Sequence, residues 1–64
     1  MPIIRVEMIS GRTREQKRNL VKELTQAFNR TCGATPEDVQ VVIADIDKED
    51  WAAAGTLMAD KSPA

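Results

Sequence analysis

The lack of any internal cross-link is the feature that most constrains how this chain can fold. Cys32 is the single cysteine and there is no histidine, so neither an internal disulfide nor an ordinary zinc site can stabilise the 64 residues. A chain of this length buries only about 60% of the surface that its unfolded form exposes, which leaves a small apolar core. Small domains without cross-links or metals gain their stability by association. We therefore expect an oligomer.

Charge and hydropathy argue against several classes of partner. The chain has nine Lys and Arg, ten Asp and Glu, one Trp, one Phe and no Tyr. It therefore offers neither the basic surface nor the stacking aromatics typical of proteins that bind nucleic acid. Its longest apolar run is four residues, which is too short for a transmembrane span or a signal peptide. We expect no nucleic-acid or membrane partner, and a cytoplasmic protein with a reduced cysteine.

Hydrophobic periodicity predicts a strand, a helix and a second strand. Residues 3–9 alternate with a period of two, which is typical of a strand. Thr13 and Gln16 form a capping box ahead of a helix over about 14–32, in which apolar side chains recur at intervals of three and four. Residues 39–46 are rich in β-branched side chains with apolar residues on both faces, as in an interior strand.

These elements predict an α/β (α+β) fold with a single βαβ unit and a C-terminal β-hairpin. Two strands joined by a helix of about five turns run parallel, with a right-handed crossover. An acidic turn over 47–50, a hairpin around Gly55 and a polar tail over 58–64 complete one domain, residues 1–64. A two-stranded sheet is too small to be stable alone, and one helix covers only one of its faces. The remaining face and the edges need other subunits.

Pro2 is the first candidate for chemistry. Removal of Met1 would leave a secondary amine at the N-terminus. A free α-amino group has a pKa of about 7.7–8.0, and a dry site with a nearby cation lowers the pKa of an amine toward neutrality. Without histidine, proton transfer must otherwise use a carboxylate, Cys32 or a lysine. The alternative is that Pro2 only begins an edge strand, where its missing N–H does no harm.

Several motifs in order resemble the short-chain 4-oxalocrotonate tautomerase family. They are Met-Pro-Ile-Ile at the start, Gly-Arg-Thr at 11–13 before a helix reading Glu-Gln-Lys at 15–17, Val-Ile-Ala-Asp-Ile at 42–46, and Trp51 before a glycine-containing hairpin. The resemblance covers residues 2–58. It implies a tautomerase-like subunit that assembles as a hexamer, a trimer of dimers. It also implies an amino-terminal proline that moves a proton between carbons of an enol or dienol acid, with no metal or cofactor.

The resemblance assigns roles to individual positions. Pro2 matches the catalytic proline, and Arg12 matches an arginine that holds the substrate carboxylate, usually from a neighbouring subunit. This is chemically sensible, because a guanidinium binds a carboxylate with two hydrogen bonds. Trp51 stands where the family has a phenylalanine that lines the pocket. The alternatives are a solvated loop position for Arg12 and a core or subunit contact for Trp51.

Gln40 is the main departure from the family, whose best-known members carry a second substrate-binding arginine there. Glutamine donates a neutral hydrogen bond, and charge-assisted bonds are about twice as strong. We expect a rate loss on the order of 100-fold, as for one missing oxyanion donor. Arg5 could compensate, although a strand arginine more often pairs with a glutamate such as Glu7.

The predicted function is a cofactor-independent tautomerase acting on small 2-hydroxy or 2-oxo unsaturated acids, with Pro2 as base and Arg12, Gln40 and Trp51 binding the substrate. Two alternatives remain open. A chain that keeps Met1 has no basic nitrogen at Pro2 and would be an inactive oligomeric scaffold. A dehalogenase or hydratase would need a carboxylate that activates water, and none is marked out. Asp45 and the acidic residues at 47–50 read as a solvated turn, and Cys32 as a small buried side chain on the helix stripe.

Overall fold

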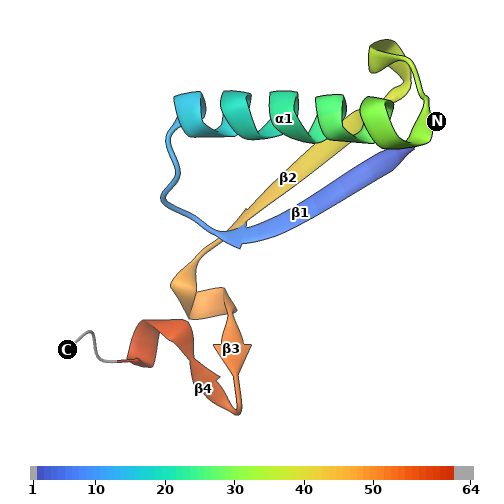
Figure 1. The fold of residues 1–64 in the computed structure, drawn as a ribbon. Coiled ribbons are helices and arrows are strands. Elements are labelled where there is room, and N and C mark those ends of the chain that lie inside the picture. The colour runs from blue at the N-terminus through green and yellow to red at the C-terminus, as the bar shows by residue number, and fades with distance from the viewer. Residues whose placement is uncertain (1, 62–64) are drawn as a thin grey trace.

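The computed structural model describes residues 2–61, and its elements follow the predicted order (Figure 1). The main elements are β1 (Ile3–Ile9), α1 (Arg14–Cys32) and β2 (Gln40–Ile46). The hairpin consists of β3 (Ala52–Ala53) and β4 (Thr56–Leu57). Short 3₁₀ turns are η1 (Pro36–Asp38), η2 (Lys48–Asp50) and η3 (Met58–Asp60). The predicted βαβ unit with a C-terminal hairpin is confirmed.

Both ends of α1 are set by local sequence. The Thr13 hydroxyl accepts a hydrogen bond from the Gln16 N–H at 3.1 Å, and the Gln16 side chain accepts one from the Thr13 N–H at 2.9 Å. At the other end Gly33 has a φ of 77° and donates its N–H to the Asn29 carbonyl at 3.1 Å. The apolar stripe is half-buried at Leu20, Val21, Leu24, Ala27 and Phe28.

The prediction that Cys32 is buried is wrong. Cys32 is the last residue of α1 and its side chain is exposed. The apolar stripe predicted burial from helical spacing alone. Spacing does not show that no further helical turn follows to shield this last position.

β1 and β2 form a parallel two-stranded sheet, and α1 lies across one of its faces (Figure 1). The register runs from Ile3 opposite Gln40 to Ile9 opposite Ile46. Half-buried side chains at Ile4, Val6, Val41 and Ile43 alternate with exposed ones along both strands. On the opposite face Ile3 is 64% exposed and Val42 is 44% exposed. Large apolar side chains are therefore left without cover on the face away from α1.

The chain is too open to be a self-sufficient monomer. The hairpin projects from the βαβ unit as an arm (Figure 1), and the radius of gyration is 15.1 Å, whereas a compact chain of this length has about 11 Å. The chain exposes 5051 Å², against about 4,100 Å² for a folded monomer of this mass. Within residues 2–61, Val39 is the one buried residue, at 9% exposure. These are the features of a subunit whose core is completed by neighbours.

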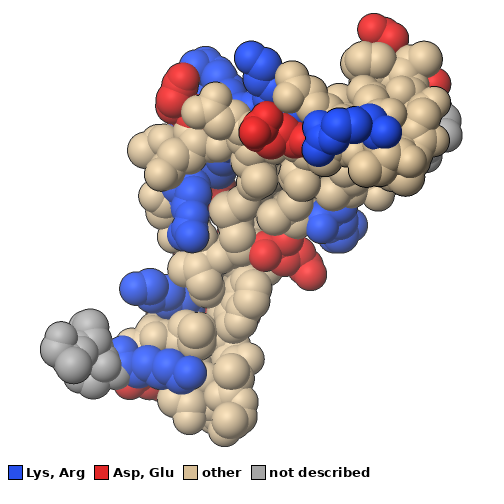
Figure 2. Space-filling model, viewed as in Figure 1, with Lys and Arg blue, Asp and Glu red and all other residues tan. Residues whose placement is uncertain are grey.

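The remainder of the surface is mixed in charge. Basic and acidic side chains are interspersed on the face shown in Figure 2. No helix within residues 2–61 is long and apolar enough to cross a membrane.

Of the polar tail predicted over 58–64, residues 62–64 lie outside the described part. Met58 begins η3 and donates its N–H to the Trp51 carbonyl at 2.7 Å, which ties the turn to the base of the hairpin.

Candidate active site

Pro2 and Gln40 lie side by side at the edge of the sheet where both strands begin. The Gln40 N–H donates to the Pro2 carbonyl at 3.0 Å, which extends the ladder that pairs Ile3 with Gln40. Because Pro2 precedes the first ladder residue of β1, its lack of an N–H leaves no ladder bond unmade. Pro2 is half-buried and Gln40 is exposed. The structure therefore brings these two predicted site residues together.

Arg12 lies at the other end of β1. It is exposed in the loop over residues 10–13 that leads into α1. The seven residues of β1 stand between this loop and Pro2, and at about 3.3 Å per residue they span roughly 23 Å. An arginine side chain cannot cover that distance. Within one chain, Arg12 and Pro2 therefore do not share a site.

Trp51 follows η2 and is half-buried. It lines a pocket of about 270 Å³ together with Glu7, Ile46, Asp50 and Ala52. Because Ile46 is the last residue of β2, this pocket lies toward the end of the sheet where the loop over residues 10–13 begins, away from Pro2. Its lining combines an indole with two carboxylates. Within one chain the indole does not enclose the candidate base.

Arg5 does not form the predicted surface pair with Glu7. Both side chains are exposed on the uncovered face of the sheet. Among residues 2–61, the ion pairs are those of Lys17 with Asp45 and of Arg18 with Glu15. The guanidinium of Arg5 is thus not engaged by an acidic side chain in the described part of the chain.

Asp45 and Asp47 are exposed, as a solvated turn predicts, but each has a side-chain partner that was not predicted from the sequence, and Asp45 lies within β2. The Asp45 carboxylate forms an ion pair with the Lys17 ammonium, and the Asp47 carboxylate accepts a hydrogen bond from the Ser10 hydroxyl at 3.2 Å. The signal in the sequence was the alternation along β2, which places Asp45 on the same face as Val41 and Ile43. Lys17 lies in the first turns of the helix that covers this face, within reach of the Asp45 carboxylate.

Comparison with known proteins finds tautomerases, both among family models and among individual relatives. Residues 2–61 match the family model described as "Tautomerase enzyme". The 2-hydroxymuconate tautomerase of Bacillus subtilis (strain 168) is 45% identical over 60 residues, which are 94% of this chain and 97% of that protein.

Solved structures agree in fold. YwhB, described as a homologue of 4-oxalocrotonate tautomerase, has a TM-score of 0.92 at 43% identity, over 95% of this chain and 100% of that chain. A 4-oxalocrotonate tautomerase from Chloroflexus aurantiacus J-10-fl, described as a heterohexamer, has a TM-score of 0.87 at 28% identity, over 94% of this chain and 97% of that chain.

Proposed function

The chain belongs to the tautomerase family, and we propose that it interconverts the enol and keto forms of small 2-hydroxy or 2-oxo unsaturated acids without a cofactor. The observation that carries this proposal is the position of Pro2, half-buried at the start of β1 and bonded through its carbonyl to Gln40. It is supported by 45% identity to a protein described as a 2-hydroxymuconate tautomerase.

In the proposed mechanism Pro2 is the general base once Met1, which lies outside the described residues, has been removed. The secondary amine takes the proton of the 2-hydroxyl group and returns a proton to the distal carbon, so the net change is an isomerisation. A free α-amino group titrates at about 7.7–8.0, close enough to neutrality for both steps. A chain that keeps Met1 has an amide nitrogen at Pro2 and lacks this base.

Arg12 binds the substrate carboxylate in a site whose Pro2 belongs to another copy of the chain. The length of β1 supports this arrangement, because it separates the two residues within one chain. The exposed apolar face of the sheet and the projecting hairpin support an assembly in which such a site can form. We propose a homo-oligomer, with a hexamer built as a trimer of dimers as its form.

Gln40 and Trp51 complete the proposed site. Gln40 donates a neutral hydrogen bond to the polarised 2-oxo end of the substrate, next to Pro2 on the adjoining strand. Trp51, contributed by a different copy, provides an apolar wall that excludes water from the amine. A neutral donor stabilises developing negative charge less than a guanidinium does, so we expect slower turnover than in relatives with arginine at this position. The cytoplasm is the proposed location.

The proposal is tested by assaying chains with and without Met1, distinguished by intact mass, on 2-hydroxymuconate and phenylenolpyruvate. The trimmed chain should accelerate ketonisation of at least one of them, and the chain that keeps Met1 should not. Absence of activity in an assembled, trimmed protein would favour the inactive scaffold. A loss of substrate absorbance without formation of the keto acid would favour hydration.

A further inference from the structure

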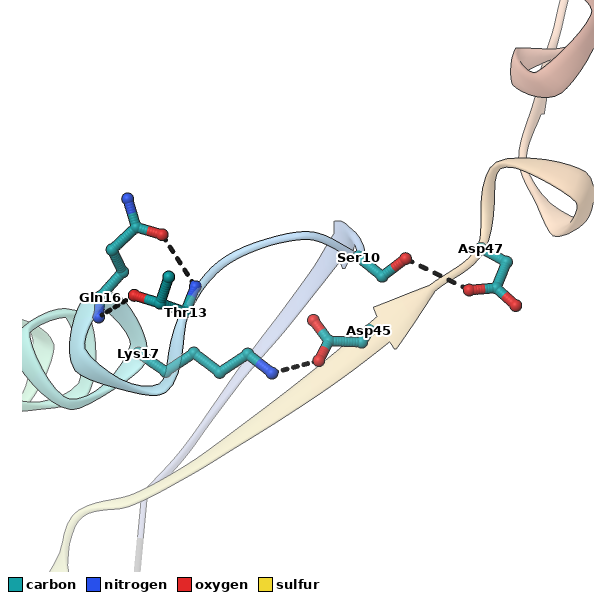
Figure 3. A network of polar contacts seen from close by, with 6 residues as sticks. All are labelled: Ser10, Thr13, Gln16, Lys17, Asp45 and Asp47. Carbon is teal, nitrogen blue, oxygen red and sulfur yellow. Dashed lines mark hydrogen bonds and ion pairs between the residues drawn. The ribbon is translucent and has the colours of Figure 1, made fainter.

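The loop that carries Arg12 is held at both ends by residues 45–47, which are the last two residues of β2 and the residue after it. We call residues 10–13 the Arg12 loop. At its start the Ser10 N–H donates to the Ile46 carbonyl at 2.9 Å, and the Ser10 hydroxyl donates to Asp47 Oδ1 at 3.2 Å. Figure 3 shows Asp45, near the end of β2, directed toward Lys17, and Asp47, just beyond the strand, directed toward Ser10.

The other end of the Arg12 loop is held through the first turn of α1. Thr13 and Gln16 form the capping box, and the Lys17 N–H donates to the Thr13 carbonyl at 3.1 Å. The Lys17 ammonium in turn pairs with the Asp45 carboxylate (Figure 3). The residue that closes the first helical hydrogen bond therefore also connects the helix to β2.

The backbone of Arg12 is bracketed by these two anchors. Gly11 has a φ of 132°, a backbone conformation that glycine adopts far more readily than other residues. With Ser10 and Thr13 both bonded, Gly11 and Arg12 are the loop residues between the fixed ends. The two anchors therefore fix where the backbone of Arg12 stands relative to the end of β2.

The Lys17–Asp45 pair is better explained by positioning than by stability. Its side chains are 31% and 34% exposed, and ion pairs with that much access to solvent contribute little to the free energy of unfolding. By contrast, a small displacement of a group that must meet a substrate in another subunit has a large effect on binding and rate. A weak pair is enough to select one orientation of a short loop.

We propose that Asp45 and Asp47 are positioning residues that orient Arg12, and thereby set the affinity for the substrate carboxylate. This inference rests on the proposed role of Arg12 as the carboxylate-binding residue. Neither carboxylate needs to touch the substrate, because Asp45 acts through Lys17 and the helix cap, and Asp47 acts through Ser10. Substitution of either should therefore change KM and leave the proton transfer at Pro2 nearly intact.

The experiment compares the trimmed, assembled protein with Asp45→Asn, using 2-hydroxymuconate as the probe and light scattering to verify the assembly. We expect KM to rise by about fivefold to tenfold while kcat changes by less than about twofold. Asp45→Glu retains the charge and should recover most of the loss. Glu15→Gln removes the solvent-exposed pair with Arg18, at 3.5 Å, which lies within the first turns of α1 and does not connect the helix to β2, and is the matched control that should leave KM unchanged.

A double-mutant cycle with Arg12→Ala decides whether Asp45 acts through Arg12. If it does, Asp45→Asn should raise KM no further once Arg12 is absent. An equal rise of KM in both backgrounds, or no rise in the single variant, would overturn the inference while leaving the role of Arg12 in place. If Arg12→Ala itself leaves KM unchanged, the role proposed for Arg12 fails and this inference fails with it.

A second variant keeps the inference testable should Asp45→Asn not assemble. Asp47 is exposed, so Asp47→Asn should fold and assemble normally while releasing the other end of the Arg12 loop. It too should raise KM with little change in kcat. An unchanged KM for Asp47→Asn, together with the same result for Ser10→Ala, would contradict the inference.

Discussion

Pro2 and Arg12 lie at opposite ends of β1, with the seven residues of that strand between them. The distance of roughly 23 Å that follows from strand geometry excludes a site made from the Pro2 and Arg12 of one chain. If both residues act on one substrate, they do so across a subunit boundary. Catalysis and assembly are then inseparable, because a monomer would hold the base and the carboxylate-binding group too far apart to act on one substrate.

The first prediction concerns the assembly. The chain exposes about 1,000 Å² more than a monomer of its mass should, and Ile3 and Val42 are uncovered on the sheet. Light scattering at micromolar concentration should therefore give the mass of a multimer, with six chains as the expected form. A stable, folded monomer at that concentration would contradict both the assembly and the shared site.

The second prediction is that intact active sites can be restored by assembling two impaired variants into one hexamer. Arg12→Ala should raise KM by at least about tenfold, because the carboxylate loses a charged partner in ground and transition states alike. A Pro2→Leu variant should keep Met1, because methionine is removed ahead of small residues only, and should therefore lack a free amine at position 2. Hexamers assembled from both variants by co-expression contain some sites with an intact Pro2 and an intact Arg12, since each comes from a different chain.

Co-expressed hexamers of Arg12→Ala and Pro2→Leu should accordingly show more activity at low substrate concentration than either variant alone. Mixing the two purified proteins without subunit exchange is the control, and should show only the sum of the separate activities. If the co-expressed hexamers show no more than this sum, Pro2 and Arg12 do not act together on one substrate across a subunit boundary, and the shared site is contradicted.

The third prediction concerns the end of α1. Gly33 has a φ of 77° and no atom lies within 4 Å of the place a Cβ would occupy, so Gly33→Ala meets no steric clash. The left-handed backbone conformation is nevertheless unfavourable for alanine, by about 1 kcal/mol. Urea unfolding at fixed protein concentration should show a loss of that size. Ala34→Gly, one residue beyond the cap, is a neighbouring control for the effect of the substitution on the unfolded chain.

The elements of the fold were predictable because their signals are local. The capping box at Thr13 and Gln16, the left-handed cap at Gly33 and the alternation of residues 3–9 each depend on residues within four positions of one another. The parallel pairing of the two strands followed from the length of the helix between them.

The partners of charged residues were harder to predict, because they depend on register and on which face α1 covers. Asp45 pairs with Lys17, 28 residues earlier, and Asp47 bonds to Ser10, 37 residues earlier. A linear scan groups both carboxylates with their acidic neighbours in the sequence. The pocket beside Trp51 likewise depends on a register that brings Glu7 near Ile46. Cys32 was misassigned because helical spacing does not show where a helix end leaves a side chain exposed.

The fourth prediction concerns the amine at Pro2. In trimmed protein, kcat/KM should rise with pH as the amine loses its proton, because only the unprotonated amine can act as a base. The midpoint should lie at or below the range of about 7.7–8.0 that applies to a free α-amino group, if a guanidinium from another copy is near. Chains that keep Met1 should be inactive throughout. Equal activity with and without Met1 would exclude the amine mechanism and direct attention to Asp45 and Glu7.

The last prediction tests Gln40 as the cause of slow turnover. Gln40 is exposed and its backbone is held by the bond to Pro2, so Gln40→Arg should be accommodated without disturbing the sheet. The new guanidinium would give a charged donor to the 2-oxo end, where negative charge develops, and should raise kcat on 2-hydroxymuconate by about tenfold or more. Gln40→Lys adds the charge without the bidentate geometry and should recover less. In chains that keep Met1, Gln40→Arg should not raise kcat, because a better electrophilic group cannot assist a proton transfer that lacks its base. An equal rise of kcat with and without Met1 would show that the added charge acts independently of the Pro2 amine, and that Gln40 does not serve the site proposed for it.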